Sequence, residues 1–325
     1  DVVALANDGL QAITMTELYK PDLITMDLRM PRMKGVEAIS AIMQEFPTPI
    51  VVVSNSWMSG NLDEEMEALS VGAEAVVKKP PHNLASDYQT IRDELVSTIR
   101  VMGGIKVLRR RNRSSSESSI AQLPRIDRKT EQLPRAGVQI VGIAASTGGP
   151  QARKRLLSLL PDDFSLPILI VQHITKGFLE GFVTWLQSFT RLRLEIAQAG
   201  QFPESGAVYF APQDRHLGIT SLGRFSLSDA PPLSGFRPSA TWLFRSMGQY
   251  FQERVLGLIL SGMGDDGAVG LGEIYRSGGI VYAQDPSQCV VYGMPRAAVE
   301  MGFVTGSLTV EEMAERLRQL SSPET

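Results

Sequence analysis

The chain has 325 residues, of which 43% are hydrophobic and 21% are charged, and its formal net charge is −3. This length and composition are ordinary for a globular chain with room for two domains. The charge gives no basic excess for nucleic-acid binding, and no apolar run reaches the roughly 18 residues of a membrane span. Cys289 is the single cysteine, so no internal disulfide can form. With no signal peptide visible, we expect a cytoplasmic enzyme that does not insert into a membrane.

Three short apolar segments in the first hundred residues end at or next to polar side chains, namely Asp27, Ser54 and Lys79. The segments are residues 22–27, 49–54 and 75–80. Each has the composition of a buried parallel strand, and parallel strands bring their carboxyl ends to one edge of a sheet. A carboxylate, a hydroxyl and a lysine at that edge are suited to accepting a phosphoryl group and stabilising its oxygens.

This arrangement resembles a response-regulator receiver domain, a flavodoxin-like α/β fold, over residues 1–104. The resemblance implies Asp27 as the phosphoacceptor, Ser54 as the switch hydroxyl, Lys79 as the receiver lysine, and a chemotaxis histidine kinase as phosphodonor. Residues 1–9 are predicted to be the second strand and its turn, so the first strand and its acidic pair have no counterpart. Mg²⁺ needs carboxylates as well as phosphate, so a magnesium site with Asp27 alone is expected to be incomplete. We therefore expect poor phosphorylation of this form.

Residues 105–136 differ in composition from what precedes and follows them. They carry a basic run from Arg109 to Arg113, then serines, and they include Pro124 and Pro134 without a hydrophobic period. A stretch of about thirty such residues is longer than ordinary connections within a domain, so we predict a flexible linker. The basic run is short and lacks interleaved aromatic residues, which argues against nucleic-acid binding.

The most informative stretch of the chain is an apolar strand, residues 138–145, that runs directly into Ser146. Gly148 and Gly149 permit a sharp turn after the strand, and Pro150 is suited to opening a helix. Taken alone, such a turn fits either a mounted nucleophile or a phosphate-binding loop. A general base at the same edge of the sheet would favour the nucleophile.

Histidines are scarce in this chain: they are His82, His173 and His216. His173 ends an apolar segment at residues 166–173, and Asp265 and Asp266 follow another at residues 255–260. Ser146, His173 and an aspartate at one sheet edge are the parts of a nucleophile, base and orienting acid. His216, which we expect in a loop, is the second choice for the base or a residue lining the substrate groove.

Several motifs of residues 137–325 together resemble the catalytic domain of the chemotaxis receptor methylesterases (CheB). They are Ser146-Thr147-Gly148-Gly149-Pro150, Gln172-His173, Gly262-Met263-Gly264-Asp265-Asp266-Gly267 and Gly293-Met294-Pro295-Arg296. The resemblance implies a mostly parallel, doubly wound α/β domain that hydrolyses γ-glutamyl methyl esters and deamidates some glutamines. The substrates would be methyl-accepting chemotaxis receptors, and catalysis would need no cofactor.

The resemblance also assigns roles position by position. Ser146 would be the nucleophile, His173 its base and Asp266 the acid of the triad. Thr147 and Met263 occupy the positions of the backbone groups that stabilise the oxyanion. These roles are what the family pattern implies for this sequence.

Two positions depart from the family pattern, because Ala144 replaces a common glycine and Phe236 replaces a common histidine. Arg237, next to Phe236, is a candidate for contacting the substrate. The simpler alternative is that Arg237 is a surface cation without a functional role.

The departures leave open a non-catalytic chemotaxis regulator or docking protein. A nucleotide-dependent oxidoreductase is a weaker alternative, because the strand after the glycine-rich turn ends in Gln172-His173 and not in the acid that would hold a ribose.

Overall fold

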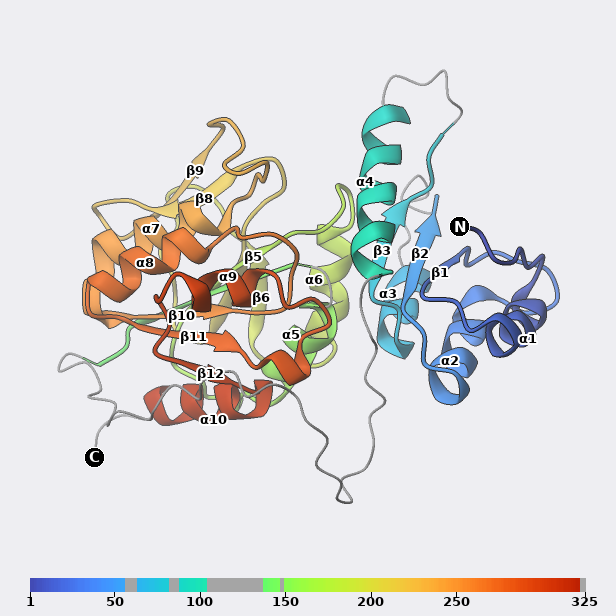
Figure 1. Ribbon diagram of the computed structural model, residues 1–325. Helices are drawn as coiled ribbons and strands as arrows, with labels where there is room; N and C mark the ends of the chain where they lie inside the picture. Colours follow the sequence, from blue (N-terminus) through green and yellow to red (C-terminus); the bar gives the residue numbers. More distant parts are fainter. Residues whose placement is uncertain (56–62, 82–87, 104–136, 147–148, 322–325) are drawn as a thin grey trace.

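The computed structural model contains two α/β units (Figure 1). The structure describes residues 1–55, 63–81, 88–103, 137–146 and 149–321. The predicted linker at 105–136 lies outside the described residues, as do His82 and Thr147. Among the helices of the described ranges, none is long and apolar enough to cross a membrane.

The N-terminal unit, residues 1–103, contains a parallel three-stranded sheet with the order β1-β2-β3. Its strands are β1 (Ile24–Met26), β2 (Ile50–Ser54) and β3 (Ala75–Lys78). Its helices are α1 (Gly9–Tyr19), α2 (Gly35–Glu45), α3 (Asp63–Val71) and α4 (Tyr88–Met102). Parallel register aligns Ser54 with Lys78, so the predicted switch hydroxyl and Lys79 lie at the same sheet edge.

Residues 1–6 form no strand, and the prediction of a second strand there is wrong. Val2 and Leu5 have exposed fractions of 81% and 80%. In the flavodoxin-like strand order 2-1-3-4-5, the second strand pairs only with the first, and no described residue supplies that partner. Asp8, which lies in the segment predicted to be a strand and its turn, caps α1 by accepting the backbone N–H of Gln11 at 2.9 Å.

A seven-stranded sheet, in which every strand pairs in parallel, forms the centre of the C-terminal unit, residues 137–321. The strands are β4 (Ile140–Ala145), β5 (Ile168–Gln172), β6 (Arg193–Ile196), β7 (Ala207–Phe210), β10 (Val255–Ile259), β11 (Ile280–Gln284) and β12 (Gly306–Leu308). They are arranged in the order β12-β11-β10-β4-β5-β7-β6. The chain starts in the middle of the sheet at β4 and adds strands first to one side and then to the other.

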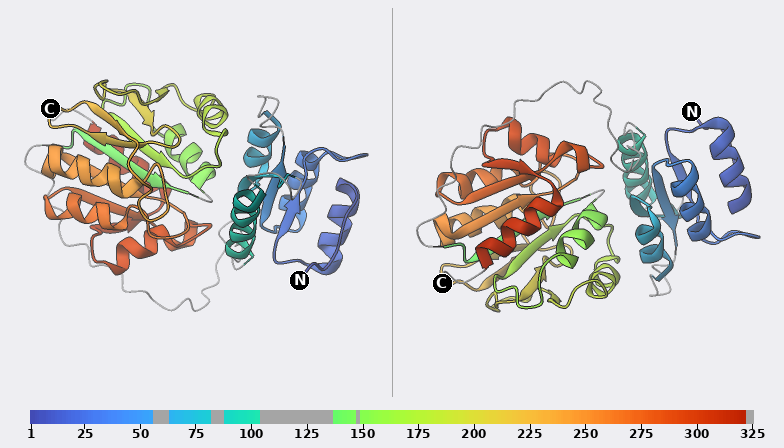
Figure 2. Two further views of the ribbon diagram at one scale, coloured as in Figure 1. Left: turned by 90° about the horizontal axis from the view of Figure 1, so that it is seen from above. Right: turned by 90° about the horizontal axis from the view of Figure 1, so that it is seen from below.

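Helices cover both faces of this sheet (Figures 1 and 2). They are α5 (Gly149–Ser158), α6 (Leu179–Gln187), α7 (Ala240–Phe251), α8 (Ala268–Arg276), α9 (Met294–Glu300) and α10 (Val310–Ser321), with short 3-10 turns η2 (Gln252–Arg254) and η3 (Pro286–Gln288). Alternate residues of β4 enter two separate apolar clusters: Ile143 packs with α5, α6 and α10, and Ala144 packs with α7, α8 and α9. This confirms the predicted mostly parallel, doubly wound α/β fold.

A small antiparallel hairpin of β8 (His216–Ile219) and β9 (Phe225–Ser228) precedes α7. His216 is therefore the first residue of a strand, and its prediction as a loop residue is wrong. The run is only four residues long, which is too short for a clear alternating pattern. Helix α7 begins at Ala240, directly after its N-cap residue Ser239.

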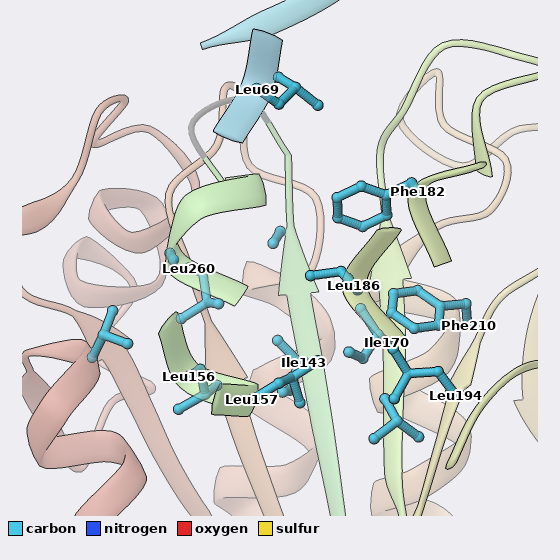
Figure 3. Close-up of a cluster of buried hydrophobic side chains, with 14 of the residues drawn as sticks. Leu69, Ile143, Leu156, Leu157, Ile170, Phe182, Leu186, Leu194, Phe210 and Leu260 are labelled. Atoms are coloured by element: carbon cyan, nitrogen blue, oxygen red, sulfur yellow. The ribbon is translucent and has the colours of Figure 1, made fainter. Parts of the chain in front are cut away.

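The N-terminal unit packs against the C-terminal unit through α3, β3 and α4 (Figure 2). Figure 3 draws Leu69 of α3 in one apolar cluster with Phe182 of α6. Thr175, in the segment after β5, donates from Oγ1 to Glu94 Oε1 at 2.7 Å and lies 3.1 Å from the Val76 carbonyl oxygen. Gln151 also donates to the backbone of Leu69. The contacts thus combine apolar packing with hydrogen bonds.

Candidate active site

The candidate site lies where the strand order reverses, between the adjacent strands β4 and β10. Open parallel sheets place ligands at this switch point, beyond the carboxyl ends of the strands. Ser146 follows β4, and its backbone N–H donates to the Ser261 carbonyl just after β10 at 3.1 Å. The backbone N–H of His173, after β5, donates to the Ala145 carbonyl at 3.0 Å. Backbone hydrogen bonds therefore tie the three strand ends together.

Asp266 is buried, with an exposed fraction of 1%, and its two oxygens accept four hydrogen bonds. The donors are His173 Nε2 at 2.9 Å, Ser239 Oγ at 2.6 Å, Ala240 N at 2.7 Å and Thr241 N at 3.1 Å. Three of them belong to the start of α7, whose free N–H groups and dipole favour an anion. The carboxylate is thus held by one helix terminus and one imidazole.

Burial alone would raise the pKa of Asp266. The hydrogen bond and charge of His173 and the hydrogen bonds from Ser239 and Ala240 outweigh that effect and hold the pKa below its usual value. Asp266 is therefore an ionised, acceptor-only group near neutral pH. It follows that His173 Nε2 carries the hydrogen in this contact.

The other ring nitrogen of His173, Nδ1, is buried and has no hydrogen-bond partner among the residues that the structure describes. Since Nε2 carries the hydrogen, Nδ1 of the neutral ring has a free lone pair and can accept a proton. Ser146 and His173 line the same pocket. Asp266 thus holds Nε2 of His173, while Nδ1 is free on the side of the pocket that also contains Ser146. This arrangement suits His173 to act as a general base.

Ser146 is positioned by close contact between the ends of β4 and β10. A Cβ added at Gly262 would lie 2.8 Å from Ser146 Cβ and 2.3 Å from Met294 Sδ, so only glycine fits there. Ser261, the other serine near this edge, is fully buried, and its Oγ accepts the Val291 N–H at 2.9 Å. Ser261 therefore has a structural role, while Ser146 reaches the pocket.

Of the two positions predicted for oxyanion stabilisation, Met263 lines the pocket and Thr147 lies outside the described residues. Arg237 also lines the pocket. Its Nη1 donates to the carbonyl oxygens of Asp229 and Ala230 at 3.1 and 3.2 Å, while its buried Nε has no partner in the described structure. Arg237 thus holds the backbone of Asp229 and Ala230 in place, and its Nε–H remains a buried donor at the pocket.

The structure corrects the interpretation of His216. Its exposed fraction is 0%, its Nδ1 accepts the Ser239 N–H at 3.2 Å, and its Nε2 donates to the Pro231 carbonyl at 3.2 Å. Its ring also stacks on Trp242, with centroids 4.7 Å apart. With both nitrogens hydrogen-bonded and no exposure, His216 supports the fold, and these contacts argue against a role as the base or in the groove.

The pocket that contains Ser146 and His173 has a volume of about 430 Å³ and is lined by both units. From the N-terminal unit it receives Met66, Leu69, Glu74, Ala75, Val76, Val77, Glu94, Ser97 and Thr98. Met263, after β10, also packs against an apolar cluster that contains Val77 and Met102. The N-terminal unit therefore covers the candidate nucleophile and base.

At the predicted phosphoryl site, Lys79 Nζ donates to Asp27 Oδ2 at 2.8 Å, and Ser54 donates to Glu65. A receiver fold implies Mg²⁺ beside the phosphoacceptor. Within the described ranges there is no group of three or more His, Cys, Asp or Glu residues that could hold a metal ion. The described residues around Asp27 therefore do not supply the several carboxylates that Mg²⁺ needs beside a phosphate.

Comparison with known proteins identifies the family. The family model described as CheB methylesterase matches residues 141–317, and the response regulator receiver domain matches residues 2–88. The chain belongs to the CheB methylesterase family. A protein-glutamate methylesterase/protein-glutamine glutaminase of Myxococcus xanthus is 42% identical over 97% of this chain and 88% of its own length. One of Syntrophus aciditrophicus is 39% identical over 98% of this chain and 91% of its own length.

A solved structure agrees with this CheB assignment. The crystal structure of the Thermotoga maritima CheB methylesterase catalytic domain is 33% identical, with a TM-score of 0.55. It covers 56% of this chain and 98% of that domain. Together with the two family-model matches, it confirms the predicted resemblance to a receiver domain and a methylesterase domain.

Two residues of this CheB site did not emerge from the sequence reasoning as parts of the site. Ser239 bridges the start of α7 to Asp266. Its position after Pro238 and before a helical pattern is an N-cap signal that could have found it. Phe236, noted only as a departure from the family pattern, lies on the ring of His173 with centroids 4.0 Å apart. No sequence signal predicts that contact, because the two residues are 63 positions apart in the chain.

Proposed function

We propose that this chain hydrolyses γ-glutamyl methyl esters, and deamidates some glutamines, on the cytoplasmic part of methyl-accepting chemotaxis receptors. The protein would act in the cytoplasm and need no cofactor for this reaction. The observation that carries the proposal is the His173–Asp266 hydrogen bond beside Ser146 at the β4/β10 switch point. The relatives named as protein-glutamate methylesterases support the choice of substrate.

The reaction would proceed through an acyl-enzyme. Ser146 Oγ attacks the ester carbonyl while His173 Nδ1 takes its proton, and Asp266 stabilises the imidazolium that forms. His173 then returns the proton to the departing methoxide, which leaves as methanol. Water, activated by the same nitrogen, hydrolyses the acyl-enzyme to a glutamate and restores Ser146. With a glutamine substrate the leaving group is ammonia.

The direct test is methanol release from methylated receptor by Ser146→Ala. We expect nearly all hydrolysis to be lost with the fold intact, because a serine hydroxyl beside a pocket contributes little packing. Ser158→Ala, an exposed serine at the end of α5, is the matched control and should hydrolyse at the normal rate. Normal turnover by Ser146→Ala would remove Ser146 as the nucleophile.

We further propose that the receiver controls access to Ser146, with Asp27 as phosphoacceptor, Ser54 and Lys79 as the switch, and a chemotaxis histidine kinase as phosphodonor. The pocket shared by both units supports this proposal. Receivers are in general phosphorylated with Mg²⁺, whereas the described residues offer no cluster of ligands around Asp27. Hydrolysis measured with and without a small-molecule phosphodonor and Mg²⁺ tests this control. Activation that disappears in Asp27→Asn would support it, and an unchanged rate would contradict it.

A further inference from the structure

The phenyl ring of Phe236 lies parallel to the imidazole of His173, with centroids 4.0 Å apart and 5° between the planes. The triad assignment makes no use of this contact. We propose that Phe236 is a positioning residue for the hydrolysis: its ring fixes the plane of the His173 imidazole and stabilises the imidazolium that forms during the reaction. The inference rests on the proposed function, and it adds a residue to the same site.

The Phe236 ring is carried by a segment with a fixed backbone. Phe236 N–H donates to the Leu233 carbonyl and Leu233 N–H donates to the Phe236 carbonyl, both at 3.0 Å. The next residue, Arg237, donates from Nη1 to the Asp229 and Ala230 carbonyl oxygens. These bonds hold both ends of the turn that carries the ring. Phe236 can therefore act as a support for His173 and not as a freely moving loop side chain.

The same segment also holds Asp266. Three residues after Phe236, Ser239 donates to Asp266 Oδ1, and Ala240 N–H donates to Oδ2. One stretch of chain thus fixes His173 in two ways: Phe236 covers a face of the ring, and Asp266 accepts its Nε2–H. Tilting the imidazole out of its plane would break the stacking on Phe236, and turning it over within that plane would break the Nε2–Asp266 hydrogen bond. The free Nδ1 therefore keeps one orientation.

The stacked ring also favours the charged form of His173. The face of a phenyl ring carries partial negative charge, which attracts a cation within about 6 Å of the centroid. A neutral imidazole gains only packing from this contact, so the attraction grows as the ring takes the serine proton. Covering one face removes some water from the cation, but Asp266 at 2.9 Å balances its charge. An interaction stronger in the transition state than in the ground state raises kcat.

The test compares Phe236→Leu, which keeps an apolar side chain without a π face, with Phe236→Tyr, which keeps the face. Phe202→Leu is the matched control, because Phe202 has an exposed fraction of 46% and its ring contacts Arg224 instead of a histidine. With the full chain and methylated receptor, we expect Phe236→Leu to lose roughly tenfold in kcat, the scale of a desolvated cation–π contact, with KM unchanged. Phe236→Tyr and Phe202→Leu should retain kcat.

A measurement without substrate separates this inference from the proposed function. Proton NMR of the full chain should show the His173 Nε2–H, hydrogen-bonded to Asp266, as a protected downfield signal. The signal should persist in Phe236→Tyr and Phe202→Leu and should be lost to exchange with water in Phe236→Leu. An unchanged signal together with an unchanged kcat in Phe236→Leu would overturn the positioning role. Absence of hydrolysis by every form, wild type included, would instead overturn the proposed function, and the NMR comparison would still decide whether Phe236 orients the ring.

Discussion

The buried carboxylate of Asp266 determines which nitrogen of His173 is free to act. Since Asp266 accepts the Nε2–H, the proton acceptor of the ring is Nδ1. The neighbouring carboxylate Asp265 is exposed and makes no such contact in the described structure. Two adjacent acids therefore have different surroundings, and the sequence alone cannot separate them without the family pattern.

Asp266→Asn should reduce kcat strongly, on the order of 10³- to 10⁴-fold by analogy with the effect of the same change in a serine protease triad. An amide at this position can present an N–H to Nε2, which would move the ring hydrogen to Nδ1 and block proton uptake from Ser146. Asp265→Asn is the control and should retain most activity. The measurement is initial-rate methanol release with intact folding checked by circular dichroism. Similar losses from both substitutions would leave the acid unassigned.

At the scale of secondary-structure elements, the N-terminus of α7 connects helix capping to catalysis. Ser239 is fully buried, donates to Asp266 at 2.6 Å and accepts the Trp242 N–H at 3.4 Å as the N-cap. The N–H groups of Ala240 and Thr241 also donate to the carboxylate. Asp266 thus accepts the free N–H groups at the start of α7 and also orients His173.

Ser239→Ala should lower the free energy of unfolding by about 1–2 kcal/mol, because it removes both an N-cap and a buried hydrogen bond to a carboxylate. It should also lower kcat by less than Asp266→Asn does, since the two α7 N–H groups remain. Ser239→Thr, which keeps the hydroxyl, should recover part of both losses. Urea denaturation and kcat measured on the same preparations test this. Unchanged stability in Ser239→Ala would show that the cap is not needed.

The sequence predicted most elements that carry the site, because each strand is an apolar run of about five residues that ends at a polar group. Ser146, His173 and Asp266 follow β4, β5 and β10, and parallel strands bring their ends together. The hairpin strand at His216 was not predicted, because four residues give too little pattern. Residues 1–6 have the composition of a strand, but strand formation also requires a neighbour to pair with.

At the scale of the whole molecule, the two units share the pocket that contains Ser146, and we propose that their interface controls access to it. The interface could not be predicted from the sequence, because it joins α3, β3 and α4 to segments more than seventy residues further along the chain. Its polar contacts include Thr175 with Glu94, and its apolar contacts include Leu69 with the cluster of Phe182. Basal activity should therefore depend on how stable this closed arrangement is.

Glu74 makes that stability depend on pH. Its side chain is half-buried at the shared pocket, and burial raises its pKa from 4.5 to about 7. The other charged or titratable groups that line the pocket are Glu94, His173, Lys176, Asp214 and Arg237. Between these pH values the folded chain binds a proton that the unfolded chain does not bind. The stability contributed by protonated Glu74 is therefore lost as pH rises from about 4.5 to about 7. Above pH 7, the closed interface must bury a charge or open.

Glu74→Gln removes that charge while keeping the shape of the side chain. We expect the variant to be more resistant to thermal unfolding than wild type at pH 8, and to differ little from it near pH 5, where wild-type Glu74 is mostly protonated. Because a more stable closed interface shields Ser146, the ratio of wild-type to variant basal hydrolysis should increase as pH rises from about 4.5 to about 7 and should level off above that pH. Comparing the two forms at each pH cancels the pH dependence of the chemical step itself.

The matched control is Glu67→Gln, because Glu67 is an exposed glutamate on α3. The ratio of wild-type to Glu67→Gln hydrolysis should stay constant with pH. A constant ratio for Glu74→Gln as well would mean that the charge of Glu74 does not influence how the receiver covers the active site.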